Sequence, residues 1–281
     1  MTAPVFLAPP SSPPNSPLKS SPNSPSGLSS GLSSGALAAV QPGDRYILTG
    51  DEGRHARVVQ RLQAGELVDI VDGSGLRLRC EVVPPDGLGK DVLSVTVLSR
   101  TTEPNPVPAL TLVQALAKGE ASELAIAQAV EVGVSAIQPW QSERAIVIWR
   151  GERAAKSAVK WETAVSRAAK QARRALVPPV RPVVTTPELA TLVQRTVQAD
   201  GAAFVLDGAA SASLADVPLP TTGEILVIVG PEGGISADEI ARLTAAGAVS
   251  VTAGPHIMRS STAGAVATAA LMLRLGRWGA R

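Results

Sequence analysis

The chain has 281 residues, of which 45% are apolar and 2% aromatic, and its formal net charge is +2. So few aromatic residues exclude a sheet that stacks RNA bases on clustered Phe and Tyr. One cysteine and two histidines exclude an internal disulfide and predict no metal site. We expect no transmembrane helix and no signal peptide, because long apolar runs are absent and prolines interrupt the N-terminus. A cytoplasmic location follows as the expectation.

Residues 1–38 are predicted to form a disordered tail. Of the first 35 residues, 11 are Ser, 8 are Pro and 3 are Gly, and Lys19 is the only charged one. Such a segment buries too little apolar surface to offset its ordering entropy. A proline-rich ligand for a partner and a misassigned translation start remain as alternatives. We therefore expect that removal of residues 1–35 leaves stability unchanged.

Residues 39–103 are predicted to form a small β-barrel domain. Short alternating runs at 45–48, 66–71, 76–83 and 92–98 are separated by turn sequences rich in Gly, Pro and Asp. One helix is expected over 51–63, with Asp51 as its N-cap. The proline-rich stretch 104–108 reads as a stiff linker.

Residues 104–281 alternate between strand and helix patterns. We expect strands at 110–116, 136–139, 145–149, 202–206, 224–229 and 249–253, and helices at 122–132, 153–176, 187–199, 236–246 and 262–278. This alternation predicts an α/β domain, a parallel sheet with helices on both faces. Ligands of such sheets bind beyond the carboxyl ends of the strands, so the loops after Leu206, Val229 and Ala253 are candidates.

Positive charge concentrates between residues 144 and 181. This stretch holds ten basic and two acidic side chains, a local charge of +8, so the remainder of the chain carries −6. Such an excess favours contact with a polyanion such as a nucleic acid. The alternative is the solvated face of a long helix, although solvated faces usually mix both signs.

Two glycine-containing loops follow predicted strands. Gly230–Gly234 lies before a helix that Ser236 and Glu239 begin with a capping box, and it has neither Walker nor Rossmann spacing. Taken alone, it fits a tight turn or a ligand loop. The second loop covers 252–263 and leads into an alanine-rich helix that Ser261 or Thr262 can cap.

Several blocks occur together in one order. They are Lys118-Gly119, Glu131-Val132-Gly133-Val134, Ser142-Glu143-Arg144, Gln171 with Arg174 and Pro178, Gly230-Pro231-Glu232-Gly233-Gly234, and Gly254-Pro255-x-Ile257-Met258-Arg259-x-x-Thr262-Ala263, preceded by His55-x-x-x-Val59-x-Arg61 and Asp72-Gly73-Ser74. With them, residues 40–280 resemble the ribosomal RNA small-subunit methyltransferase E family of the SPOUT class.

The resemblance implies a PUA-like β-barrel RNA-binding domain at 39–103 and a SPOUT trefoil-knotted methyltransferase domain at 104–281. It implies a homodimer that uses S-adenosylmethionine to methylate N3 of one uridine in small-subunit (16S) ribosomal RNA. One alternative is a knotted methyltransferase that acts on transfer RNA or large-subunit RNA. A second is a non-catalytic RNA-binding assembly factor. A third is an α/β enzyme for a small phosphorylated metabolite, which the +8 segment disfavours.

The resemblance also implies roles for individual residues. Arg144 and Arg259 would stabilise the uridine anion, and Glu232 would accept its proton or anchor the loop backbone. The implied cofactor-binding residues are Leu206, Ile228, Gly230, Gly233, Gly234, Ala253, Gly254, Ile257, Met258, Ser261 and Thr262. The implied RNA-binding residues are His55, Arg61, Lys118, Lys170, Arg173 and Arg174.

Three positions depart from the family pattern. Ser261 stands where the family usually has Glu, Lys170 where a Glu is usual before Gln171, and His256 where Arg is common. The first departure matters most, because a Glu that served as an obligatory base would be missing here. A serine at this position instead favours a capping or packing role.

Overall fold

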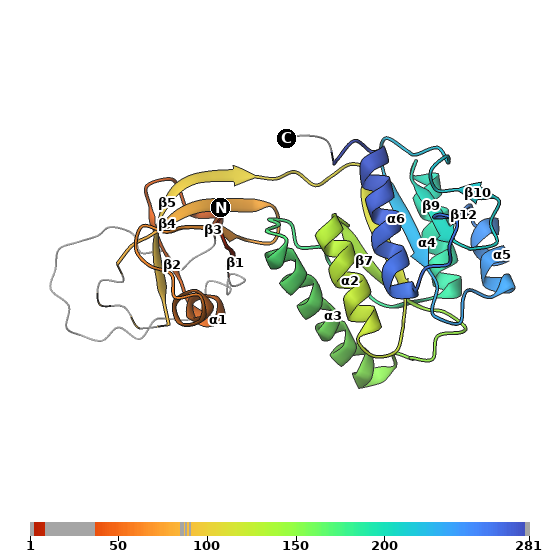
Figure 1. The fold of residues 1–281 in the computed structure, drawn as a ribbon, viewed down its shortest axis with the longest axis horizontal. Helices are drawn as coiled ribbons and strands as arrows, with labels where there is room; N and C mark the ends of the chain where they lie inside the picture. Colours follow the sequence, from red (N-terminus) through yellow and green to blue (C-terminus); the bar gives the residue numbers. More distant parts are fainter. Residues whose placement is uncertain (1–2, 9–36, 85–86, 88, 90, 279–281) are drawn as a thin grey trace. The chain divides into compact units, whose positions relative to one another are not determined.

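The computed structural model describes residues 3–8, 37–84, 87, 89 and 91–278. The chain divides into two compact units (Figure 1). The N-terminal unit comprises Met1–Pro104 together with Arg173–Leu176, and the C-terminal unit comprises Asn105–Ala172 and Val177–Arg281. The fold is mixed α/β, as expected. The division differs from the predicted domain boundary at residues 103/104 in one respect, since Arg173–Leu176 belong to the N-terminal unit.

The N-terminal unit contains a five-stranded sheet in the order β1-β3-β4-β5-β2. The strands are β1 (Val5–Leu7), β2 (Arg45–Leu48), β3 (Leu67–Val71), β4 (Leu76–Val82) and β5 (Leu93–Thr102). β1 pairs with β3 in parallel, and the other pairs are antiparallel. Residues of β4 alternate between buried and half-buried, so one face of the sheet forms the core of this unit.

The predicted tail over residues 1–38 is wrong for Val5–Leu7, which form β1. Phe6 is fully buried in the core of the N-terminal unit, and Ala8 N–H donates to the Val71 carbonyl at 2.8 Å. Composition averaged over 35 residues hid three consecutive apolar residues, which suffice for an edge strand. Leu37–Ala39 form a 3₁₀ turn, η1. Residues 9–36, the remainder of the predicted tail, lie outside the described residues.

The helix predicted over 51–63 is shorter and irregular. An α-helical segment, α1 (Gly50–Arg54), continues into a π-helical turn, η2 (His55–Val59). Arg61 has a φ of 55°, in the left-handed region, so the helix cannot continue through it. The expectation that residues 51–63 are helical is therefore wrong beyond Val59.

Cys80 is fully buried in β4. Burial raises the pKa of its thiol to about 12, and the nearby Asp69 carboxylate adds to the increase. A thiol with this pKa stays protonated at neutral pH and is a poor nucleophile. Cys80 is therefore a core residue of the N-terminal unit.

The C-terminal unit contains a seven-stranded sheet in the order β10-β12-β9-β11-β6-β7-β8, in which all neighbouring strands are parallel. The strands are β6 (Ala109–Ala115), β7 (Ala136–Gln141), β8 (Val184–Thr185), β9 (Ala202–Leu206), β10 (Ala212–Ser213), β11 (Glu224–Val229) and β12 (Val249–Thr252). The predicted parallel sheet is thus confirmed. The two-residue strands β8 and β10 were not predicted, because they are too short for any periodicity.

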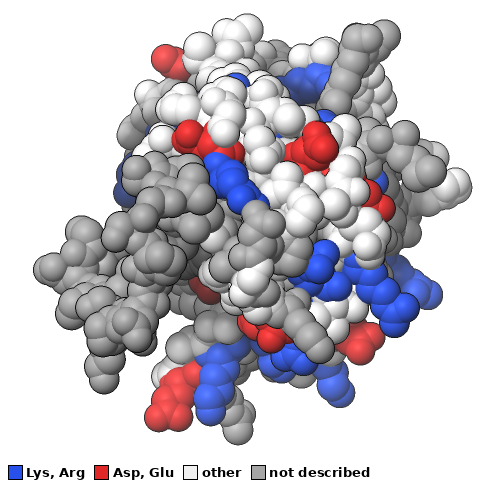
Figure 2. Space-filling view, turned by 90° about the vertical axis from the view of Figure 1, so that its left-hand side faces the viewer, with Lys and Arg blue, Asp and Glu red and all other residues white. Residues whose placement is uncertain are grey.

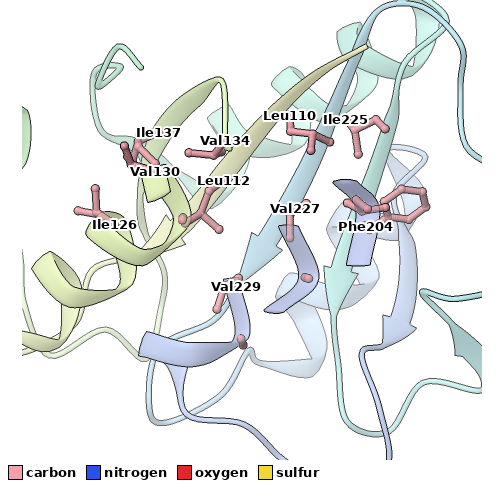
Figure 3. Packing of buried hydrophobic residues seen from close by; sticks show 14 of the residues in the cluster. Leu110, Leu112, Ile126, Val130, Val134, Ile137, Phe204, Ile225, Val227 and Val229 are labelled. Atoms are coloured by element: carbon pink, nitrogen blue, oxygen red, sulfur yellow. The ribbon is translucent and has the colours of Figure 1, made fainter. Parts of the chain in front are cut away.

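Five helices cover the two faces of this sheet (Figure 1). They are α2 (Ala121–Val132), α3 (Gly151–Gln171), α4 (Thr186–Gln198), α5 (Ala237–Ala245) and α6 (Ser260–Arg274). Apolar residues of α2, α3 and α6 pack on one face, and those of α4 and α5 pack on the other. Figure 3 shows the core on the face covered by α2, α3 and α6, where Leu112 of β6 lies between Ile126 and Val130 of α2 on one side and Val227 of β11 on the other.

The strand expected at 145–149 is absent. Residues 143–150 form a loop between β7 and α3, in which Ile146 and Ile148 are exposed. Alternating Ile and Val side chains resembled a strand, but no neighbouring strand pairs with this segment. α6 begins at Ser260, so Ser261 and Thr262 lie inside the helix and do not cap it as expected.

The helix predicted over 153–176 ends at Gln171. Arg173 has a φ of 58°, which ends the helix, and Arg173–Leu176 belong to the N-terminal unit. There Gly75 N–H donates to the Ala175 carbonyl at 3.2 Å, and Arg77 donates to the Arg173 carbonyl at 2.9 Å. Ala175 is fully buried against Val5.

No helix among the described residues is both long enough and apolar enough to cross a membrane. Nor do His, Cys, Asp and Glu side chains in the described ranges come together in a group of three or more that could hold a metal ion.

Candidate active site

A cavity of about 710 Å³ lies at the carboxyl ends of β9, β11 and β12 in the C-terminal unit. Its volume is within the range of small-molecule sites, and its position is where parallel α/β sheets bind ligands. The three loops that were expected to form a site therefore converge. The cavity is lined by Ala121, Leu206–Gly208, Val229–Glu232, Gly234, Ile235, Ile240, Thr252–Ser261 and Ala263.

The loop after β11 requires glycine at two positions. A Cβ on Gly230 would lie 2.5 Å from Cγ1 of Ile235, and Gly234 has a φ of 73°. Gly234 N–H donates to the Pro231 carbonyl at 2.9 Å and closes a tight turn. The sequence fits either a tight turn or a ligand loop, and the structure shows a tight turn that also forms part of the cavity wall.

The start of α6 is tied to this loop by a buried relay of hydrogen bonds. The Ser260 hydroxyl donates to the Gly230 carbonyl at 2.7 Å and accepts from Nε2 of Gln114 at 2.9 Å. Gln114 is fully buried near the carboxyl end of β6. α6 packs closely on β6 at this point, since a Cβ on Gly264 would lie only 2.8 Å from Cδ1 of Leu112. The relay fixes the Gly230 carbonyl at the cavity.

Arg144 lies beside the same loop, although 89 residues separate it from Gly233 in the sequence. It is exposed, in the loop after β7, and its Nη1 donates to the Gly233 carbonyl at 3.1 Å. Arg259 and Glu232 are also exposed, and both line the cavity. Two of the three residues predicted to be catalytic thus line the cavity, and the third contacts the loop at its wall.

Most of the predicted cofactor residues line the cavity, namely Leu206, Gly230, Gly234, Ala253, Gly254, Ile257, Met258 and Ser261. Three do not. Ile228 is fully buried in the core under α4 and α5, Gly233 faces Arg144, and Thr262 is exposed on the first turn of α6. Side-chain type and loop position do not distinguish a cavity residue from its neighbour along the chain.

Sequence reasoning missed Asp207, which lines the cavity directly after β9. Its carboxylate accepts hydrogen bonds from the Ser250 hydroxyl at 3.1 Å and from Ala209 N–H at 3.0 Å. These bonds hold an acidic group at the cavity wall. The sequence does contain a signal for this residue, because Asp207 is the first polar residue after β9, in one of the three candidate loops.

The residues predicted to bind RNA fall in both units. Lys118 is exposed after β6, and Lys170 is half-buried in the last turn of α3. In the N-terminal unit, His55, Arg61 and Arg173 are exposed.

Arg174 differs from these residues because it is half-buried in the N-terminal unit. Desolvation lowers the pKa of Arg174 to about 10, although the Glu103 carboxylate opposes the decrease. Arg174 therefore stays charged at neutral pH while much of its side chain is out of contact with water.

Further basic residues line the outer face of α3. Lys156, Lys160 and Arg167 are exposed and, at spacings of four and seven residues, lie on one side of the helix, opposite the buried Trp161 and Val165. The charge concentration seen in the sequence thus coincides with a solvent-facing helix surface. Figure 2 shows Lys and Arg side chains gathered on the lower part of the face in view, with acidic side chains among them.

Three comparisons with known proteins agree with this geometry. The family model of the RNA methyltransferase domain matches residues 103–272. Ribosomal RNA small subunit methyltransferase E of Mycobacterium bovis is 43% identical over 234 residues, which cover 83% of this chain and 88% of that protein.

Two solved structures are similar over most of the chain. One is a ribosomal RNA small subunit methyltransferase E from Neisseria gonorrhoeae bound to S-adenosyl methionine, with a TM-score of 0.74, 28% identity, and coverage of 97% of this chain and 98% of that one. The other is a putative methyltransferase from Legionella pneumophila in complex with the same cofactor, with a TM-score of 0.72, 27% identity, and coverage of 84% and 94%.

The domain match and the site define the class of the protein, which is an RNA methyltransferase. Within that class, identity of 43% over most of the chain decides the family. The chain belongs to the ribosomal RNA small subunit methyltransferase E family, as its sequence blocks had indicated.

Proposed function

We propose that this protein transfers a methyl group from S-adenosylmethionine to N3 of a specific uridine in small-subunit (16S) ribosomal RNA. The observation that carries the proposal is the convergence of three strand-end loops on one cavity, with Arg144 and Arg259 beside it. Family membership supplies the reaction class. The residues of this chain supply the positions of the groups.

The cavity suits the proposed cofactor. Exposed backbone of the loops at 230–234 and 252–258 offers donors and acceptors for an adenosine, and Ile257 and Met258 offer an apolar surface for its ring. The carboxylates of Asp207 and Glu232 add negative charge at the wall, which favours a cationic ligand. When bound, S-adenosylmethionine supplies a methyl group already activated by its positively charged sulfur.

The uridine must lose its N3 proton to become a good nucleophile. Arg144 and Arg259 are exposed cations at the cavity and its adjoining loop, and they stabilise the negative charge that develops on O2 or O4. Glu232 is exposed at the cavity wall and either accepts the proton or anchors the loop. Since N3 lies on the Watson–Crick edge, the target base has to be unpaired or flipped.

RNA contact is assigned to basic side chains rather than to aromatic stacking. His55, Arg61, Lys118, Lys170 and Arg173 contact the phosphate backbone or base edges. In the C-terminal unit, the exposed face of α3 adds Lys156, Lys160 and Arg167. Arg174 contributes charge from a partly desolvated position. Affinity for RNA then falls steeply with salt concentration.

The finer fold assignments are part of the same proposal. The N-terminal sheet is a PUA-like barrel, and the C-terminal unit is a SPOUT trefoil knot. The convergence of the segments at 206–208, 229–235 and 252–261 on one cavity supports the second assignment. The protein is cytoplasmic and forms a homodimer. Exposed apolar side chains at and along α6, namely Ile257, Val266 and Leu273, support the dimer.

One alternative function has an observation in its favour. Ser261 lines the cavity where the family usually has Glu, as an RNA-binding assembly factor without catalysis would allow. The hydrogen bonds at the start of α6 are made by Ser260 instead, so the helix start is held without a carboxylate at 261. Methylation therefore remains the stronger reading of the site.

Mass spectrometry of small-subunit RNA tests the proposal. Purified protein is incubated with S-adenosylmethionine carrying a labelled methyl group and with either free 16S RNA or assembled small subunits. One labelled 3-methyluridine is expected, and calorimetry is expected to detect cofactor binding. Labelled transfer RNA or large-subunit RNA would move the substrate assignment. Cofactor binding absent at millimolar concentration, or RNA binding without label, would refute the enzymatic function.

A further inference from the structure

Glu239 is a buried carboxylate outside the cavity. It lies in the first turn of α5, and only 4% of its surface is exposed. Its Oε1 accepts hydrogen bonds from Glu143 N–H at 2.8 Å and from the Thr186 hydroxyl at 2.7 Å. Its Oε2 accepts from Ser236 N–H at 3.1 Å. Burying a carboxylate costs free energy unless such bonds replace water, and here both oxygens are occupied.

These bonds join three separate segments of the C-terminal unit. Glu143 belongs to the loop after β7 and directly precedes Arg144, and Thr186 is the first residue of α4. Ser236 is the N-cap of α5 and follows the glycine loop at 230–234. Glu239 therefore connects the backbone next to Arg144 with the end of the loop whose carbonyl Arg144 contacts.

A second glutamate of the chain shows what a cap alone requires. Glu188 occupies the same capping-box position in α4, but it is exposed and bonds only to Thr185, through the backbone N–H at 2.7 Å and the hydroxyl at 2.8 Å. These bonds lower the pKa of Glu188. Capping thus needs neither burial nor contact with a distant loop. The hydrogen bonds that Glu239 accepts from Glu143 and Thr186 are therefore additional to its capping role.

We propose that Glu239 is a positioning residue that holds Arg144 against the glycine loop of the cofactor cavity. The inference rests on the proposed function, because it assigns Arg144 to the uridine. Glu239 does not line the cavity and acts only through the Glu143 backbone. Arg144 is exposed, and its side chain makes one hydrogen bond, to Gly233, among those the structure gives. The position of Arg144 is therefore determined mainly by its backbone.

The size of the effect follows from geometry. Hydrogen bonds to a carboxylate are stronger than neutral ones, and the Glu143 bond is short enough to be of this kind. Glu239→Gln keeps the shape of the side chain but replaces one acceptor oxygen by an NH₂ group, which then faces N–H of either Ser236 or Glu143. Displacement of a catalytic group by about 1 Å costs on the order of a hundredfold in rate.

The experiment compares Glu239→Gln with Glu188→Gln, the matched capping-box glutamate of α4. Methyl transfer gives kcat and the KM for RNA, and calorimetry gives the Kd for S-adenosylmethionine. We expect kcat of Glu239→Gln to fall roughly tenfold to a hundredfold, with the cofactor Kd changed less than about threefold. Glu188→Gln is expected to keep kcat within about twofold, because its carboxylate touches no catalytic segment.

A double-mutant cycle with Arg144→Ala shows whether Glu239 acts through Arg144. The loss caused by Glu239→Gln should largely disappear in the Arg144→Ala background, because residues that act together are not additive. Independent losses that multiply in the double variant would overturn the proposal, as would unchanged kcat in Glu239→Gln. If Glu239→Gln does not fold, Thr186→Val removes one hydrogen bond to Oε1 and is expected to lower kcat in the same way.

Hydrogen exchange supplies a readout that does not need methyl transfer. The Glu143 amide should exchange faster in Glu239→Gln than in the unmodified protein and in Glu188→Gln. Unchanged exchange there would overturn the positioning role even if the protein were inactive. Faster exchange together with an inactive unmodified protein would keep the structural link and refute the proposed function instead.

Discussion

Phe6 gives the most direct test of the N-terminal unit. Although it lies in a segment whose composition predicted a disordered tail, it is fully buried in the core of that unit. β1 is also held by backbone hydrogen bonds, from Asp69 N–H to the Pro4 carbonyl at 2.9 Å and from Ala8 N–H to the Val71 carbonyl at 2.8 Å. Phe6→Ala removes a complete core side chain from an otherwise intact strand.

The expected cost is about 3–5 kcal/mol of unfolding free energy, the usual range for Phe→Ala in a core. Because 1.4 kcal/mol corresponds to a factor of ten, the N-terminal unit should open roughly a hundredfold to a few thousandfold more often. Tyr46, the single tyrosine, is buried in this unit, and all four tryptophans lie in the other. Tyrosine and tryptophan signals therefore report on the two units separately.

Hydrogen exchange of β3 and β4 measures the change directly, with β9 and β11 as an internal reference. Val59→Ala is the control, because Val59 is 64% exposed in the same unit. Exchange in β3 and β4 should rise in Phe6→Ala and not in the control. Replacement of residues 10–35 by a short linker, with residues 1–8 kept, should leave exchange unchanged. Unaltered exchange in Phe6→Ala would refute the assignment of β1 to the core.

Three further outcomes are expected. Arg259→Ala keeps the melting temperature but lowers methyl transfer by about a hundredfold or more, and near-normal turnover would make Arg259 structural. Joint replacement of Lys156 and Lys160 by Ala reduces the slope of log K for RNA binding against log salt concentration by about 1.4, because each lysine is expected to contact one phosphate of a single strand. An unchanged slope would place the RNA elsewhere. Ser260→Ala weakens cofactor binding and costs about 1–3 kcal/mol of stability, since the Gly230 carbonyl loses its hydroxyl donor, and unchanged calorimetry would contradict this.

The sheet of the C-terminal unit could be predicted because its strands are buried on both faces. A continuous apolar run such as Ile225–Val229 is typical of a strand that is buried on both faces. The strand predicted at 224–229 agrees with β11 residue by residue. The segment 145–149 fails the same test, because Ile and Val alternate there while Ile146 is 82% exposed. Apolar pattern alone does not tell a strand from a loop that keeps its apolar side chains at the surface.

Boundaries that depend on long-range contacts could not be predicted. Nothing local to residues 153–176 ends the helix at Gln171, since Ala, Arg and Leu all favour its continuation. The termination becomes understandable only with Ala175 buried beside Val5 and with Gly75 donating to its carbonyl. Val5 lies 170 residues earlier in the sequence, so helix propensity was overridden by tertiary packing.

In the candidate site too, residues placed by local sequence could be predicted, and residues placed by long-range contacts could not. Residues that line the cavity through their own loop, such as Gly230 and Met258, follow from the rule that ligands bind beyond the ends of parallel strands. Glu239 does not, because the sequence gives it a complete role as the capping partner of Ser236. Its second role depends on the loop of Glu143, 96 residues away, reaching the same oxygen. A local motif that already accounts for a residue conceals any further contact, and the burial of that carboxylate is the signal that one exists.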